Sequence, residues 1–125
     1  MTFWVFAALA VAGGLGAVAR FVVDGLIRAR WKTAYPWATT VINVTGSALL
    51  GFLAALAAAK LVSGDLTAIA GTGFLGGYTT FSTASYETVR LLKARRYGAS
   101  LASGLGMLVA CVGAAALGLW LGSLI

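Results

Sequence analysis

Residues 71–90 read GTGFLGGYTTFSTASYETVR, a glycine-rich run followed by a cluster of hydroxyl side chains. The apolar sequence on both sides predicts a membrane-spanning helix, and the glycines predict a break in that helix. Irregular backbone at membrane depth is tolerated only where it is buried in protein or lines an aqueous path. We therefore expect the function of the chain to reside in this segment.

The composition is that of an integral membrane protein. Of the 125 residues, 61% are hydrophobic and only 10% are charged, whereas charged residues make up about a quarter of a typical soluble domain. Apolar segments recur as far as Ile125, a pattern that differs from a signal peptide ahead of a soluble chain. The net charge of +6 indicates orientation and contact with anionic lipid headgroups, so no nucleic acid is expected as a partner.

The residue types exclude several kinds of chemistry. The chain has no histidine, and its only acids are Asp24, Asp65 and Glu87. Metal-hydrolase chemistry and histidine-based acid–base catalysis therefore lack the side chains they need. No nucleophile and base can be paired, and Cys111 has no second cysteine for a disulfide. The sequence predicts that the protein is not an enzyme.

The predicted architecture is an all-α membrane protein with one integral membrane domain over residues 1–125. A membrane span needs about 20 mostly apolar residues. Four segments meet this requirement, at about residues 3–23, 37–59, 66–92 and 98–125. The third helix is expected to break near residues 76–80 and to resume at about Phe81. Gly13, Gly14 and Gly16 in the first helix, and Gly46 and Gly51 in the second, predict close packing of backbones.

Basic residues are concentrated at one end of this four-helix plan. Only Lys60 lies at the other end, and neither terminus carries a basic side chain. The positive-inside rule therefore predicts that the first and third connections face the cytoplasm and that both termini lie outside the cell membrane. The basic residues at or just before these two connections are Arg20, Arg28, Arg30, Lys32, Arg90, Lys93, Arg95 and Arg96.

Polar side chains in the second helix mark one candidate surface. Thr39, Asn43 and Ser47 recur every four residues and therefore share one face of the helix. A carboxamide at membrane depth needs hydrogen-bond partners. Asn43 therefore either lines a pore or joins neighbouring helices, and the sequence favours neither role over the other.

A second polar surface follows the break in the third helix. Thr79, Ser82, Thr83 and Ser85 supply hydroxyl donors around Phe81, whose ring has an electropositive edge. Freed carbonyls at such a break can coordinate a cation. Neutral amide, hydroxyl and ring-edge donors suit a small anion, because they lower the cost of dehydration without trapping the ion. The alternative is that the hydroxyls satisfy backbone groups inside the helices.

Glu87 is the one acid expected inside a helix. An intramembrane carboxylate is a functional candidate by default. Arg90 lies three residues further along the chain, so a local ion pair is the alternative. We expect a vestibule or structural role for Glu87 in preference to proton coupling.

The chain resembles the CrcB/Fluc family of small fluoride channels over essentially its whole length. The matching residues are GGLGA at 13–17 with Arg20, Pro36 and Trp37 ahead of Asn43 and Gly46, and GFLGGYTTFST at 73–83, continuing to Glu87 and Thr88. The last run is highly specific. The resemblance implies an antiparallel, dual-topology dimer that encloses two narrow pathways for fluoride. Such channels passively export fluoride that enters cells as neutral HF and is trapped as the anion.

The resemblance also implies roles for individual residues. It places a structural sodium ion at the backbone carbonyls of Gly76 and Thr79. Two positions depart from the family pattern: Ala84 stands where many members have a second phenylalanine, and the fourth helix offers Ser103 as its best-placed hydroxyl, followed by Met107 and Cys111. The pathway residues expected in this chain are Asn43, Phe81, Ser82, Thr83, Thr39, Ser85 and Ser103.

The uneven charge adds a hypothesis about assembly. A homodimer of antiparallel copies requires each chain to insert in both orientations, but the basic residues of this chain favour one orientation. We therefore expect an obligate heterodimer with an oppositely oriented paralogue, with a homodimer as the alternative. Such a paralogue would supply the ring that Ala84 lacks.

Two other functions fit a four-helix plan. One is a proton-coupled exporter similar to the small multidrug resistance transporters. Such a transporter needs a carboxylate in its first helix, and no acid precedes Asp24. The other is a non-conducting partner subunit of a heterodimeric channel, which fits Ala84 and the reduced polar track of the fourth helix.

Overall fold

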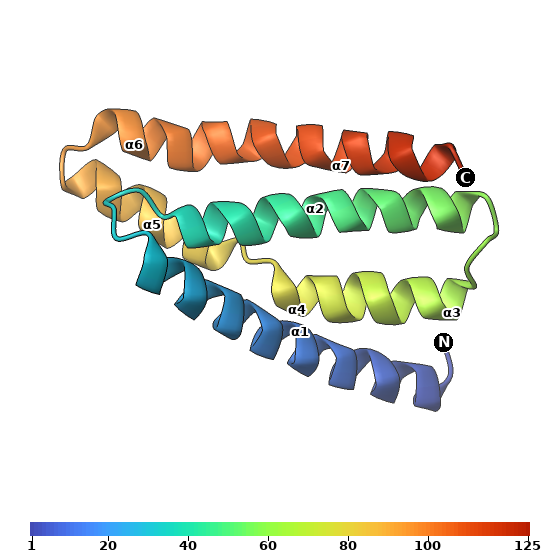
Figure 1. Cartoon of the computed structure of the whole chain (residues 1–125). Helices are drawn as coiled ribbons and strands as arrows, with labels where there is room; N and C mark the ends of the chain where they lie inside the picture. The colour runs from blue at the N-terminus through green and yellow to red at the C-terminus, as the bar shows by residue number, and fades with distance from the viewer.

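The computed structural model describes all 125 residues, and every regular element in it is a helix (Figure 1). Two stretches, η1 and η2, are π-helical, and each continues directly into its neighbours, so that four helical units result. The elements are α1 (Phe3–Arg30), α2 (Trp37–Ala58), α3 (Gly64–Thr67), η1 (Ala68–Leu75), α4 (Gly76–Tyr78), α5 (Ser82–Lys93), α6 (Tyr97–Leu101), η2 (Ala102–Gly106) and α7 (Met107–Ser123).

Three of these units are long and apolar enough to cross a membrane: Phe3–Arg30, Trp37–Ala58 and Tyr97–Ser123. The remaining unit is divided into α3–η1–α4 and α5, and neither half reaches the about 20 residues that a span requires. The all-helical class and the broken third helix are therefore confirmed. Only three of the four predicted helices qualify as spans by themselves.

The first predicted helix ends too early. The structure continues α1 to Arg30, seven residues beyond the predicted end at residue 23. Asp24 and Arg28 form an ion pair one turn apart along this extension, and Arg28 and Arg30 lie in its last turn. Pairs at this spacing and cations at a carboxyl end both stabilise a helix, which explains the extra turns.

The break in the third helix lies at residues 79–81, so it overlaps the predicted 76–80 but begins three residues later, and the helix resumes at Ser82, close to the predicted Phe81. Gly76 and Gly77 are helical members of α4. A Cβ atom on Gly77 would collide with the backbone of Gly13 in α1, so this glycine serves close packing, not chain reversal. The helix stops at Tyr78 because the next backbone groups bond to a side chain of α2, as described below. The last helical unit runs from Tyr97 to Ser123, close to the predicted 98–125.

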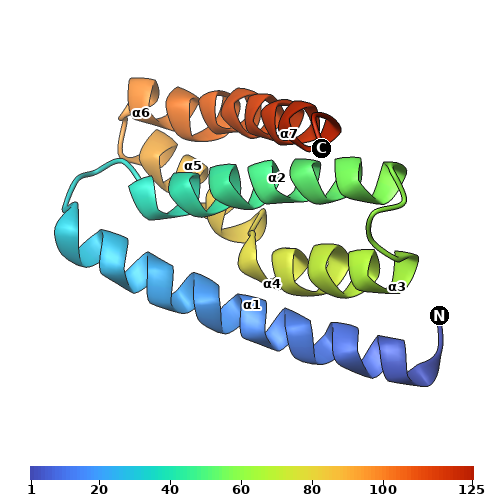
Figure 2. The ribbon, with the colours of Figure 1, turned by 45° about the vertical axis from the view of Figure 1, so that its right-hand side comes forward.

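The helices associate as two close pairs. Both ribbon views place α2 beside α7, and α1 beside η1 and α4 (Figures 1 and 2). The second half of the broken helix, α5, packs instead on α6 and η2. The first half of the broken helix thus packs on α1 and the second half packs on α6 and η2, and the break connects these two parts of the bundle.

Glycines allow each close pair to approach to backbone distance. A Cβ atom on Gly16 of α1 would overlap the carbonyl of Phe74 in η1, and one on Gly51 of α2 would overlap the carbonyl of Ala115 in α7. A Cβ atom on Gly14, in contrast, would meet no atom within 4 Å. The predicted packing role is therefore confirmed for Gly16 and Gly51, whereas Gly14 packs against no other helix of this chain.

Most of the surface is apolar, and little of the chain is buried. Only 19 of the 125 residues are buried, and large side chains such as Phe21, which is 80% exposed, face outward. Lipid solvates such a surface, whereas water does not. The buried polar residues lie between the helices, and they are Thr39, Asn43, Glu87, Ser100 and Ser103.

Candidate functional site

The side chain of Asn43 bridges the break in the third helix. Its Nδ2 donates to the carbonyl of Thr80 at 2.7 Å, and its Oδ1 accepts from the N–H of Thr80 at 2.8 Å. Its Nδ2 also donates to Sδ of Met107 at 3.4 Å. The carboxamide therefore replaces the helical partners of Thr80 and uses both of its own protons. The structure shows the helix-joining role of Asn43, while its pore role stays a prediction.

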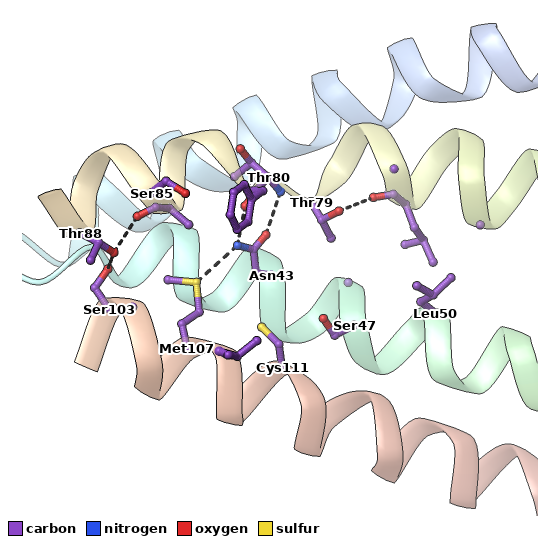
Figure 3. A pocket seen from close by; sticks show the side chains of 18 of the residues that line it. Asn43, Ser47, Leu50, Thr79, Thr80, Ser85, Thr88, Ser103, Met107 and Cys111 are labelled. Carbon is purple, nitrogen blue, oxygen red and sulfur yellow. Dashed lines mark hydrogen bonds between the residues drawn. The ribbon is translucent and has the colours of Figure 1, made fainter. Parts of the chain in front are cut away.

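Asn43 also lies in the wall of a groove of about 780 Å³ (Figure 3). The groove is bounded by residues of α2, η1, α4, α5, η2 and α7, and no charged side chain lines it. Phe81 is 87% exposed where it lines this groove. The groove brings together six residues that the sequence predicts for the site: Asn43, Phe81, Ser85, Ser103, Gly76 and Thr79.

The other predicted pathway residues lie elsewhere. Thr39 and Thr83 line a smaller hollow of about 310 Å³ next to α1, together with Arg28 and Thr80. Thr80 lines both hollows, so the break forms the wall between them. Ser82 is exposed and lines neither hollow.

Two carbonyls at the break lose their helical donors. The N–H of Thr80, which would serve the carbonyl of Gly76, is bonded to Asn43. The N–H of Thr83, which would serve the carbonyl of Thr79, is bonded to Oγ1 of Thr80 at 3.2 Å. Backbone oxygens of this kind are ligands for hard cations. Gly76 and Thr79 therefore fit a cation site made of carbonyl oxygens, and no cluster of acidic, histidine or cysteine side chains competes with it.

Glu87 pairs with the first helix, not with Arg90. Its carboxylate accepts a hydrogen bond from Nη2 of Arg28 at 2.9 Å and another from the hydroxyl of Thr39. Nε of Arg28 also holds Asp24 at 2.9 Å. The alternative of a local pair with Arg90 is wrong, because Glu87 is turned inward and is 4% exposed, whereas Arg90 is exposed.

The sequence contained a signal for this network. Asp24 and Arg28 stand four residues apart, a spacing that favours continued helix. Ending the first helix at residue 23 placed both residues in a connection and hid their position opposite Glu87. Extending the helix by two turns would have put Arg28 on a helix at the end of the bundle where its charge already placed it, within reach of Glu87.

Replacing Glu87 with alanine is expected to lower the stability of the fold by about 1–3 kcal/mol, because it removes the acceptor of a buried hydroxyl and one partner of Arg28. The melting temperature in detergent measures this loss. Arg90→Ala is the matched control on the same helix and is expected to leave the melting temperature unchanged. Equal melting temperatures for Glu87→Ala and the unmodified chain would contradict the network's structural role.

The fold and the groove define an integral membrane protein of the channel or transporter class. Polar side chains, and the residues whose carbonyls are freed at the break, line a groove in a chain whose outer surface is apolar, which is the arrangement of an ion path. Residues 7–119 match the family model described as CrcB-like protein, Camphor Resistance (CrcB). The chain belongs to this family.

Named relatives support this assignment. Fluoride-specific ion channel FluC 1 of Leifsonia xyli subsp. xyli (strain CTCB07) is 57% identical over 99% of this chain and 90% of its own length. Fluoride-specific ion channel FluC 2 of Cutibacterium acnes is 53% identical over 90% of this chain and 93% of its own. FluC 2 of Mycobacterium tuberculosis (strain ATCC 25618 / H37Rv) is 46% identical over 87% and 83%. The resemblance drawn from the motifs is confirmed.

Proposed function

We propose that the chain is a subunit of a fluoride-selective channel that lets fluoride leave the cytoplasm passively. One observation carries the proposal: a groove lined only by neutral side chains gathers Asn43, Phe81, Ser85 and Ser103 at the broken helix of a chain whose relatives are named fluoride-specific ion channels. Neutral donors lower the cost of dehydrating a small anion without binding it too tightly to leave.

The proton-coupled exporter has no support at the first helix. The only acid there, Asp24, is paired with Arg28 and lies at the end of α1 that carries the basic residues. A carboxylate held in this way is not available to exchange a proton for a cationic substrate. The relatives are named ion channels, and the chain is not an enzyme.

A second, antiparallel chain completes the proposed pathway. The groove is bounded by one chain alone, so its hydroxyls and the exposed ring of Phe81 would face lipid without a partner. Unpaired polar groups in hydrocarbon cost free energy. Two chains related by an axis in the membrane plane would cover each other's grooves and enclose two pathways.

The proposed dimer includes a structural sodium ion. The carbonyls of Gly76 and Thr79 would hold it from each chain, and both residues line the face that the partner would cover. When bound, the ion supplies positive charge between two sets of carbonyl dipoles that would otherwise repel. The chain's own contribution is to present these oxygens free of helical hydrogen bonds.

The proposed membrane orientation rests on which end of the helix bundle carries the basic residues. Both termini lie at one end, and the α1–α2 and α5–α6 connections lie at the other (Figure 1). By the positive-inside rule, the basic residues near those two connections support an orientation with that end in the cytoplasm and both termini outside the cell. Tags on the termini would therefore react with an impermeant label in whole cells, and substantial cytoplasmic protection would contradict a single orientation.

A single orientation supports a heterodimer with a paralogue of opposite charge bias. Growth in fluoride of cells that lack their own fluoride exporters tests both the heterodimer and the export of fluoride. We expect growth in fluoride to be restored by the chain with such a paralogue and not by the chain alone. Full rescue by the chain alone would contradict the obligate heterodimer, and no rescue by the pair would contradict fluoride export.

A further inference from the structure

Some hydroxyl protons in the groove are already donated to another group of the chain, and others are not. A hydroxyl has one proton to donate, and a threonine in a helix often donates it to the carbonyl four residues earlier. Thr79 and Thr88 do so, at 2.9 and 2.8 Å. Ser103 lies 3.0 Å from the hydroxyl of Thr88, and it must be the donor because the proton of Thr88 is already used.

Two of the predicted pathway residues therefore have no proton left to donate to an ion. Ser103 donates to Thr88, and both N–H groups of Asn43 are used by Thr80 and Met107. An anion gains from a polar side chain only where a proton is free to point at it. In this geometry, neither Asn43 nor Ser103 has an unused proton to turn toward an anion.

Ser47 differs from these residues. It lies one turn of α2 beyond Asn43, is half-buried and lines the groove. Its hydroxyl forms no hydrogen bond with the chain, although the carbonyl of Asn43 stands at the usual position four residues earlier. Thr45, two residues before it on the same helix, donates to the carbonyl of Val41 at 2.7 Å.

Ser85 on the opposite wall has the same property. It also lies inside a helix, is half-buried, lines the groove and donates to no group of the chain. Figure 3 shows Asn43 between Ser85 and Ser47 along the groove. The two serines therefore present unused protons on either side of the carboxamide.

We propose that Ser47 is a fluoride-binding residue, whose hydroxyl donates to the ion on the side of Asn43 away from Ser85. The proposal rests on the proposed channel function and deepens it, since it assigns the next donor of the pathway. Hydrogen bonds from hydroxyls to anions are short and strong, and fluoride, the smallest halide, gains most from them. Ser85 and Ser47 would then receive the ion in turn while Asn43 keeps the break in place.

Ser47→Ala removes the free hydroxyl proton and breaks no hydrogen bond within the chain. In liposomes where the unmodified protein conducts, we expect fluoride efflux to fall about tenfold, the effect of losing one hydrogen bond to a charged group. The fluoride concentration for half-maximal efflux is expected to rise, a change that a packing role would not cause. Ser47→Thr, which keeps a hydroxyl, should retain most of the rate.

Thr45→Val is the matched control, since it removes a hydroxyl whose proton is already committed on the same helix. Efflux through Thr45→Val is expected to equal that of the unmodified protein. Unchanged efflux and half-maximal concentration in Ser47→Ala would overturn the proposal, as would equal losses in both variants. Absence of fluoride efflux from the unmodified protein together with its paralogue would instead refute the channel function, so the two failures are distinguishable.

Discussion

Asn43→Ala is expected to reduce fluoride efflux about 100-fold, the largest effect of any single substitution in the groove. The change leaves the N–H and the carbonyl of Thr80 without partners. Each polar group left unsatisfied costs about 1–3 kcal/mol, and every 1.4 kcal/mol is about a factor of ten in an equilibrium. The break would shift or fray, and the groove's donors and carbonyls would lose their positions. A fluoride electrode outside loaded liposomes measures the rate.

Met107→Leu provides the control for this prediction. It removes the sulfur that lies 3.4 Å from Nδ2 of Asn43 but keeps both bonds to Thr80 and nearly the same volume. Efflux through Met107→Leu is expected to remain within a few-fold of the unmodified rate. If Asn43→Ala conducts as well as Met107→Leu, the carboxamide does not hold the break in its conducting form.

Gly16→Ala is expected to destabilise the fold by about 1–3 kcal/mol or more, the usual cost of overpacking. The added methyl group would meet the carbonyl of Phe74 and lies only 3.0 Å from the N–H nitrogen of Tyr78. Both neighbours are backbone, so no side chain can rotate away, and α1 would have to separate from the first half of the broken helix. The yield of monodisperse protein and its melting temperature in detergent measure this effect.

Gly14→Ala tests whether the destabilisation by Gly16→Ala comes from the position of the glycine, and not from the loss of any glycine in α1. A Cβ atom there meets nothing within 4 Å, and alanine is the better helix former. We expect a melting temperature equal to or above that of the unmodified protein. A decrease of equal size in both variants would show that backbone contact between α1 and η1 is not the cause.

The sequence predicted the helical class because composition alone determines it. Apolar runs of about 20 residues with few charges have one stable form in lipid. It also predicted a broken third helix, but it began the break at the glycines, three residues too early. Gly77 is helical because it packs against Gly13, and the chain leaves the helix where Asn43 captures Thr80. That contact joins residues far apart in sequence, so no local pattern indicates it.

The sequence predicted which residues gather at the candidate site better than it predicted the hydrogen bonds that they form. Asn43, Phe81, Ser85 and Ser103 do share one groove. Which of them has a proton free for an anion depends on neighbours in other helices, such as Thr88 beside Ser103. The partner of Glu87 was missed for a similar reason, because Arg28 comes from a helix that was expected to have ended.

Fluoride efflux from liposomes that contain the purified protein, with a paralogue of opposite charge bias present, tests the central claim most directly. Vesicles would be loaded with equal concentrations of fluoride and chloride, and valinomycin would make their membranes permeable to potassium. Ion-selective electrodes would then measure the external concentrations of both halides. The account predicts that fluoride leaves rapidly while chloride stays inside. Retention of fluoride, or chloride efflux at the same rate, would contradict it.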